Sequence, residues 1–199
     1  MDADFSIELG KDDPVLDFPW SDPAGTLAYV DAKRHPEHLA RIAEATRYPG
    51  LGDALRLLNS ARSAVETAKC DAWLTSEMDP DEDEYDATHK FASYIDFVFS
   101  DENGDSPMLQ HSFSAHEKFA REFVALLKLA PEISSRVEVC VRRCYFTNDG
   151  NVREGLYFTL YAFGYGNDDA TARLNWEVAL KLAANAVLQL SARRLWTNE

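Results

Sequence analysis

Two long stretches of alternating apolar side chains, joined by a tight turn and followed by a long helix, constrain this chain more than any other feature. The stretches cover residues 137–146 and 153–165, and the Asp149-Gly150 pair between them supplies the positive φ angles of a tight hairpin turn. The helix is predicted to begin near Asn167 or Asp168 and to run for about 26 residues, roughly 40 Å. A helix of that length can cross a whole sheet.

The same order of two strands and then a helix is predicted once before in the chain. Residues 67–77 and 89–101 have strand patterns, and the spacing of Ser114 and Glu117 predicts a capped helix that ends at Pro131. Residues 69–75 and 142–147 are also similar, which indicates an internal duplication. The predicted fold class is α+β, with two β-β-α units forming a four-stranded or slightly larger, antiparallel-rich sheet that carries two helices on one face.

The first 62 residues are organised differently. Five of the eight prolines lie in the first fifty residues, and the apolar residues come in short clusters. Residues 5–9 alternate like a brief strand, residues 16–20 resemble a turn, and residues 36–47 and 52–59 suit short helices. This region has too little periodic apolar surface for a core of its own, so we expect an N-terminal arm, residues 1–62, packed on a main domain of residues 63–199.

The net charge of −14 excludes several classes of partner. Such a charge repels phosphate backbones and anionic lipids, so we expect no nucleic acid and no membrane as partners. The N-terminus lacks the basic and apolar regions of a signal peptide, and the three cysteines fit reduced thiols, which predicts a cytoplasmic protein. Nucleotide, serine-hydrolase and zinc-helix motifs are missing, so no cofactor or metal is predicted. Catalysis stays open, because many active sites assemble from distant residues, although a non-catalytic protein is favoured.

The sheet face turned away from the helices is the candidate functional surface. By alternation it carries a series of aromatic and polar side chains from three strands: Trp73, Tyr94, Asp96, Tyr157, Thr159, Tyr161, Phe163 and Tyr165. An aromatic surface of this size needs a cover or a ligand. The N-terminal arm folding over it, a second subunit stacking against it, and a partly open ligand cavity are the three alternatives.

Two arginines inside a predicted strand, Arg142 and Arg143, are the strongest polar signal. A charged side chain in a strand is rarely buried unless it is paired, and Asp71 and Asp96 lie in strands that could be neighbours. The arginines therefore belong either to a buried ion-pair network or to an anion-binding site. The candidate ligand-binding residues are Arg142, Arg143, Asp71, Asp96, Trp73, Tyr94, Tyr157 and Tyr161.

The cysteines and histidines are weaker candidates. Cys140 and Cys144 are four residues apart, about 13 Å in a strand, which is too far for a disulfide, and buried inert thiols are favoured over reactive ones. His35 and His38 could share a helix face with Glu37, but a capping residue and a surface residue are the simpler interpretation.

Three functions stay open at this point. The first is a non-catalytic binding or interaction protein, expected to be a homodimer. The second is a small-molecule-binding enzyme or sensor that uses the aromatic and arginine-bearing face. The third is an acidic inhibitor or immunity-type protein that binds a basic protein partner through the acidic loop at residues 79–86.

Overall fold

The computed structural model describes residues 1–78, 85–100, 106–148 and 150–193, and its fold is α+β with one six-stranded mixed sheet. The strands are β1 (Asp2–Glu8), β2 (Val15–Phe18), β3 (Val65–Thr75), β4 (His89–Phe99), β5 (Ser135–Asn148) and β6 (Asn151–Gly166). The helices are the 3-10 helix η1 (Pro36–Arg41), α1 (Ala43–Arg47), α2 (Pro49–Leu58), α3 (Ser106–His111), α4 (Phe113–Leu127) and α5 (Asp169–Arg193).

The sheet has the strand order β1-β5-β6-β4-β3, and β2 pairs with β5 as well. The pairs β3–β4, β4–β6 and β5–β6 are antiparallel, whereas β1 and β2 run parallel to β5. The second strands of the two β-β-α units, β4 and β6, therefore lie next to each other. The predicted α+β class, the antiparallel-rich sheet and the placement of helices on one face are all confirmed.

The N-terminal arm contributes more to the sheet than its sequence indicates. β1 overlaps the brief strand predicted at residues 5–9, but β2 occupies residues predicted to form a turn. Both strands add to the edge of β5, β1 along residues 136–142 and β2 along residues 143–146. Local periodicity could not reveal this because the paired residues are more than a hundred positions apart in the chain.

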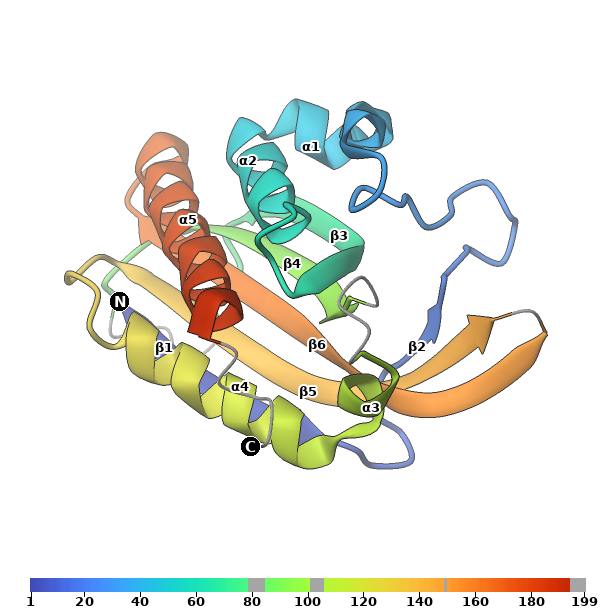
Figure 1. Ribbon diagram of the computed structural model, residues 1–199. Coiled ribbons are helices and arrows are strands. Elements are labelled where there is room, and N and C mark those ends of the chain that lie inside the picture. Colours follow the sequence, from blue (N-terminus) through green and yellow to red (C-terminus); the bar gives the residue numbers. More distant parts are fainter. Residues whose placement is uncertain (79–84, 101–105, 149, 194–199) are drawn as a thin grey trace.

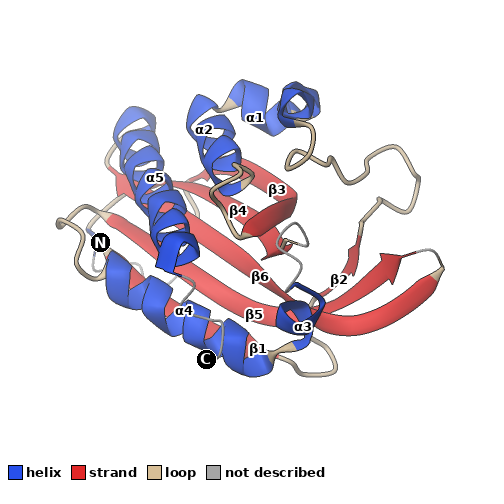
Figure 2. Cartoon of the chain, in the orientation of Figure 1, coloured by secondary structure: helices blue, strands red, loops and turns tan. Residues whose placement is uncertain are grey.

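Helices α2, α4 and α5 lie on one side of the sheet (Figure 1), and Figure 2 shows the same separation of helices from strands. Their apolar faces and the strands enclose a core whose largest fully buried side chains include Phe97, Phe99, Phe119, Phe158 and Trp176. α5 packs across β6 and touches α2 and α4 on its flanks. It begins within two residues of its predicted start.

Two predicted helix boundaries are wrong. The capping residue of α4 is Ser112, whose side chain accepts a hydrogen bond from the amide of Ala115, so Ser114 lies inside the helix instead of capping it. The single helix predicted over residues 36–47 is divided into η1 and α1, because Ile42 has an extended backbone (φ −86°, ψ 108°) that interrupts it.

The arm also shares the main core, since Leu51, Leu55 and Leu58 of α2 are completely buried.

Most of the acidic loop at residues 79–86 falls outside the described residues, as does Asp149 of the predicted turn. Gly150 has the positive φ (78°) that this turn requires. Among the described helices, none combines the length and the apolar character needed to span a lipid bilayer.

Candidate functional site

The sheet side turned away from α4 and α5, here called the open face, arranges its side chains in rows across the strands. One row joins five strands through Asp4, Glu138, Tyr161, Tyr94 and Asp71. The carboxylates of Asp4 and Asp71 lie at its two ends and the tyrosines lie in its middle. Four gaps of ~4.8 Å separate these ends by roughly 19 Å.

Four aromatic side chains on this face, Trp73, Tyr94, Tyr161 and Phe163, form a continuous series that we call the aromatic stripe. Neighbouring ring centroids are 6.5, 6.4 and 6.1 Å apart along the series. Trp73 is 38% exposed and the other three are half-buried. The aromatic stripe is therefore a partly solvent-exposed surface and not a part of the helix-covered core.

The N-terminal arm covers one end of the open face. There Trp20 donates a hydrogen bond from Nε1 to the carbonyl of Ala68 (2.5 Å), and the Tyr29 hydroxyl donates to Glu66 (3.0 Å). A small second core forms under the arm from Leu16, Ala68, Val98, Cys144 and Tyr157. At the opposite end the ring of Tyr85 stacks on Tyr165 at 3.9 Å. The aromatic stripe lies between these two covered ends.

Arg142 is buried on the open face, with 8% exposure, and its donors are used by neighbouring side chains. Nε and Nη2 both lie 2.7 Å from Glu8 Oε2, while Nη1 donates to the hydroxyls of Thr159 (2.9 Å) and Tyr161 (3.1 Å). These partners come from β1 and β6, on either side of β5. The geometry therefore matches the first of the two interpretations of this residue, a buried network that ties neighbouring strands together.

Asp96 joins the same network through Thr159, whose hydroxyl donates to Asp96 Oδ1 at 2.7 Å. Burial raises the pKa of Asp96 to about 6, although the Thr159 hydrogen bond and the charges of Lys69 and Arg142 act in the opposite direction. Glu8 behaves differently: burial acts to raise its pKa, but the hydrogen bond and charge of Arg142, together with hydrogen bonds from Ser6 and Cys140, lower the pKa of this half-exposed carboxyl.

The remaining predicted site residues are spread over the molecule. Arg143 is on the helix side of β5, where its guanidinium donates to the carbonyl of Gly10 (2.6 Å). Asp71 is exposed on the edge strand β3, and Tyr157 is buried beneath the arm. Glu8 was not predicted as part of the site. Its place in an alternating stretch predicted a strand, but nothing in the sequence indicated which strand would lie beside it.

A cavity of about 440 Å³ opens beside the open face where the arm passes β3. Trp20 and Leu27 of the arm, Glu44 of α1, and Asp71 and Tyr94 of the sheet are among its lining residues. Lys69 also lines it, with its ammonium 5.5 Å from the Trp20 ring centroid and 5.7 Å from that of Tyr94. Its volume falls in the range typical of small-molecule sites.

The three thiols are free, and burial raises the pKa of Cys70 to about 12 and that of Cys140 to about 11. Burial raises the pKa of Cys144 as well. Cys70 packs against the main core whereas Cys144 belongs to the small second core, so the matching cysteines of the suggested repeat lie on opposite faces. Such thiols are poor nucleophiles at neutral pH.

His35, Glu37 and His38 place potential metal-ligand atoms within 4.8 Å of one another at the start of η1. Both imidazole rings stack on each other at 4.9 Å, and all three side chains are substantially exposed. This cluster is consistent with ordinary surface residues at the start of a helix.

No protein-family model, curated protein or solved structure matches this chain. Its functional assignment therefore depends on the chemistry of its own surfaces.

Proposed function

We propose that this protein is a non-catalytic interaction protein and that its aromatic stripe binds a lysine- and arginine-rich segment of a partner protein. The observation that carries the proposal is the partly exposed series of four aromatic rings between two covered ends of the sheet. Contiguous aromatic surface of this kind is enriched at protein interfaces, where it supplies most of the binding energy.

Charge favours a cationic occupant. Two charge pairs on the open face, Glu8 with Arg142 and Glu138 with Arg136, largely neutralise themselves. Asp4 and Asp71 are exposed at the ends of the central row, where Lys69 and Lys90 offset their charge locally, so the attraction for a cation comes mainly from the net charge of −14 of the whole chain. A basic segment would be attracted by this charge before it makes contact.

The rings themselves are suited to cations. Three rings already have a cation of this chain nearby: Lys69 lies 5.7 Å from Tyr94, Lys90 lies 5.7 Å from Phe163, and Arg142 lies 5.6 Å from Tyr161. The ring of Trp73, which is the most exposed of the four, is the natural contact for a partner's ammonium or guanidinium group.

A second copy of this chain, the homodimer that the sequence predicts, competes for the same surface. It would bring its own Asp4 and Asp71 against the aromatic stripe, which makes self-association less favourable than binding of a basic segment. The non-catalytic assignment is supported by the bonded state of Arg142 and by the raised thiol pKa values of Cys70 and Cys140.

The experiment uses a labelled decapeptide of alternating lysine and arginine, titrated with the protein at low salt and followed by fluorescence polarisation. The double variant Trp73→Ala/Phe163→Ala is expected to bind at least about tenfold more weakly than the wild type, because it removes half of the aromatic stripe. The matched control Leu129→Ala/Leu174→Ala removes two exposed apolar side chains from the helical side and should not change the affinity.

Equal affinities for the two double variants would overturn the proposal, since the peptide would then be held by overall charge alone. Sedimentation of the same proteins gives a second decisive outcome. If the wild type is a dimer and Trp73→Ala/Phe163→Ala is a monomer, a second copy and not a basic segment occupies the aromatic stripe.

The cavity beside Trp20 favours a second candidate function, binding of a small molecule. It brings together Asp71 and Tyr94, two of the residues predicted from sequence. Ala43 of α1 also lines this cavity. Fragment binding that shifts the amide signals of residues 67–71 in NMR spectra, and that is lost when Ala43→Trp fills the cavity, would support this function. An unchanged fragment profile in Ala43→Trp would exclude this cavity as the site.

A further inference from the structure

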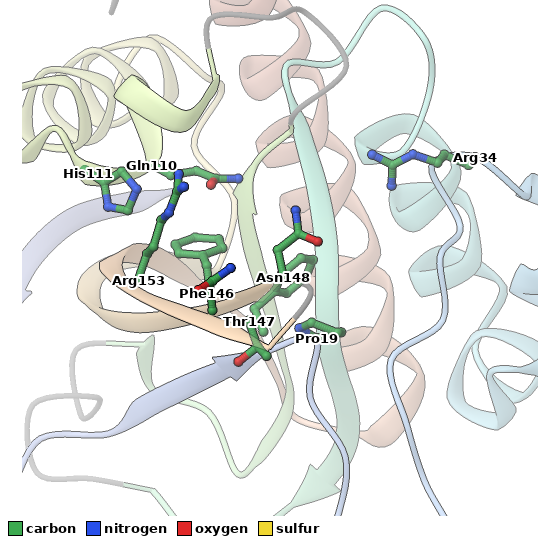
Figure 3. A pocket seen from close by; sticks show the side chains of 10 residues that line it. Pro19, Arg34, Gln110, His111, Phe146, Thr147, Asn148 and Arg153 are labelled. Atoms are coloured by element: carbon green, nitrogen blue, oxygen red, sulfur yellow. The ribbon is translucent and has the colours of Figure 1, made fainter.

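The β5–β6 hairpin lines a second cavity, of about 490 Å³, which Figure 3 shows, and no residue of the aromatic stripe is among its described lining residues. Three separate parts of the chain form its walls: the arm provides Pro19 and Arg34, the end of α3 provides Gln110 and His111, and the hairpin provides residues 146–148, 151 and 153. A cavity built from three segments exists only in the folded chain.

The described lining residues contain two arginines and a histidine but no carboxylate, in a protein whose net charge is −14. The two arginines differ in their partners. Arg34 is 3.2 Å from Asp31 and 3.6 Å from Glu66, so most of its charge is already balanced. Arg153 is exposed and, within the described part of the chain, forms no ion pair. Arg153 is thus the cation that is available to a ligand.

His111 is held beside Arg153 by a hydrogen bond between its Nδ1 and the carbonyl of Glu154. A carbonyl can only accept, so Nδ1 carries the proton, and Nε2 of the neutral ring is a hydrogen-bond acceptor and not a donor. Thr147, Asn148 and Asn151 add hydroxyl and amide donors around the same space. Guanidinium, hydroxyl and amide donors with no carboxylate among the described lining residues are the donor set of an anion-binding site.

One wall of the cavity is aromatic. The ring of Phe146 lies 5.8 Å from Phe18 and 6.1 Å from the imidazole of His111, both in tilted or edge-on geometry. These rings offer a flat apolar group a surface next to the donors. A ligand that uses the whole cavity therefore has an anionic end and a flat apolar part.

The cavity wall is also held in place by close packing. A Cβ at Gly155 would fall 2.7 Å from the carbonyl oxygen of Gln110 and 2.7 Å from the Phe146 ring, so the glycine lets α3 rest directly on β6. Gln110 is buried there and donates a hydrogen bond to the carbonyl of Phe99. Preorganised donors bind with less entropic cost than mobile ones.

We propose that this cavity binds a small organic anion that carries a flat ring, a phosphate ester or a carboxylate. Arg153, with the side-chain amides of Asn148 and Asn151, holds the anionic group, and Phe146 packs against the ring. This site shares no residue with the aromatic stripe, so the failure of one proposal leaves the other unaffected.

The test titrates the full chain with phenyl phosphate, benzoate and inorganic phosphate, using calorimetry for affinity and NMR amide shifts for location. Phenyl phosphate or benzoate is expected to bind and to shift the signals of residues 110–111 and 146–153. Tighter binding of phenyl phosphate identifies a phosphate-ester ligand, and tighter binding of benzoate identifies a carboxylate.

Arg153→Gln is expected to weaken binding about tenfold or more, because it removes a charged hydrogen-bond donor. The control Arg62→Gln removes an exposed arginine of the loop between α2 and β3 and should leave the affinity unchanged. The proposal is overturned if neither organic anion saturates the protein by about 10 mM. It is equally overturned if Arg153→Gln and Arg62→Gln bind the organic anion with the same affinity, or if inorganic phosphate binds as tightly as phenyl phosphate.

Discussion

The helix-covered face and the open face of the sheet are built from the same strands, but they bury different chemistry. On the covered face His116 is completely buried between the rings of Phe99 and Phe158, 4.8 and 4.7 Å away. On the open face Asp96 is 6% exposed and accepts a hydrogen bond from Thr159, which is itself bonded to Arg142. The covered face is stabilised by excluding water, whereas the open face is stabilised by a bonded polar network.

This difference shows how burial acts on opposite charges. Burial lowers the pKa of His116 to about 4 and raises the pKa of Asp96 to about 6. In both cases the neutral form is favoured because the charged form loses its hydration. A fall in pH therefore lowers the stability of the fold through His116 and raises it through Asp96.

The largest contrast is expected from a tryptophan on each side. Trp176 is fully buried in the core and donates to Ser93 Oγ at 2.8 Å, so Trp176→Ala should lower the free energy of unfolding by about 3–5 kcal/mol. Trp73→Ala on the aromatic stripe should cost less than about 1 kcal/mol, because this side chain is 38% exposed. Urea unfolding followed by circular dichroism measures both. Similar losses would mean that the open face is packed as tightly as the core.

The next contrast is between the two adjacent arginines. Arg142→Met should lower the free energy of unfolding by about 2–3 kcal/mol, since Glu8, Thr159 and Tyr161 all lose their shared partner. Arg143→Met breaks a single bond, to the carbonyl of Gly10, and should cost less than about 1 kcal/mol. The same urea measurement compares them. An Arg143→Met loss equal to that of Arg142→Met would contradict the assigned network.

A smaller effect is expected from His116 on acidification. Its folded pKa of about 4 lies below its unfolded value of 6.5, so its contribution to stability is complete above pH 6.5 and is lost as the pH falls toward 4. Between pH 7 and pH 5 this loss is about 2 kcal/mol. His116→Phe should remove this pH dependence when urea unfolding is repeated across the range. A variant as acid-sensitive as the wild type would show that His116 is charged in the folded core.

The smallest expected effect is the pH dependence that Asp96 gives to the free energy of unfolding, and its sign is opposite to that of His116. Its folded pKa of about 6 is above the unfolded value of 3.8, so the folded state takes up a proton first and gains stability as the pH falls from about 6. Asp96→Asn should therefore lose about 1 kcal/mol more than the wild type between pH 7 and pH 5. Equal losses in the two proteins would indicate that the network keeps Asp96 ionised.

Much of this architecture follows from local patterns in the chain. The hairpin around Gly150, the long helix α5 and the face on which Tyr94, Asp96 and Tyr161 lie were all predicted from alternation and turn chemistry. The cap of α4 was misplaced by two residues, because Ser112 and Ser114 are both good caps and only the backbone at Ser112 is extended. β2 was missed because four residues beside a proline carry too weak a periodic signal.

The surfaces to which we assign a proposed function depend on contacts that local patterns do not encode. Glu8 meets Arg142, and Arg34 meets the hairpin cavity, across separations of more than a hundred residues. The excess of negative charge follows from the amino-acid composition alone. The strand alternation and the helical periods follow from the amino-acid order, because they depend on neighbours in the chain. Which strands pair, where the arm lies and which aromatic rings stay exposed are set by long-range packing, which selects one arrangement among many that satisfy the same periodicity.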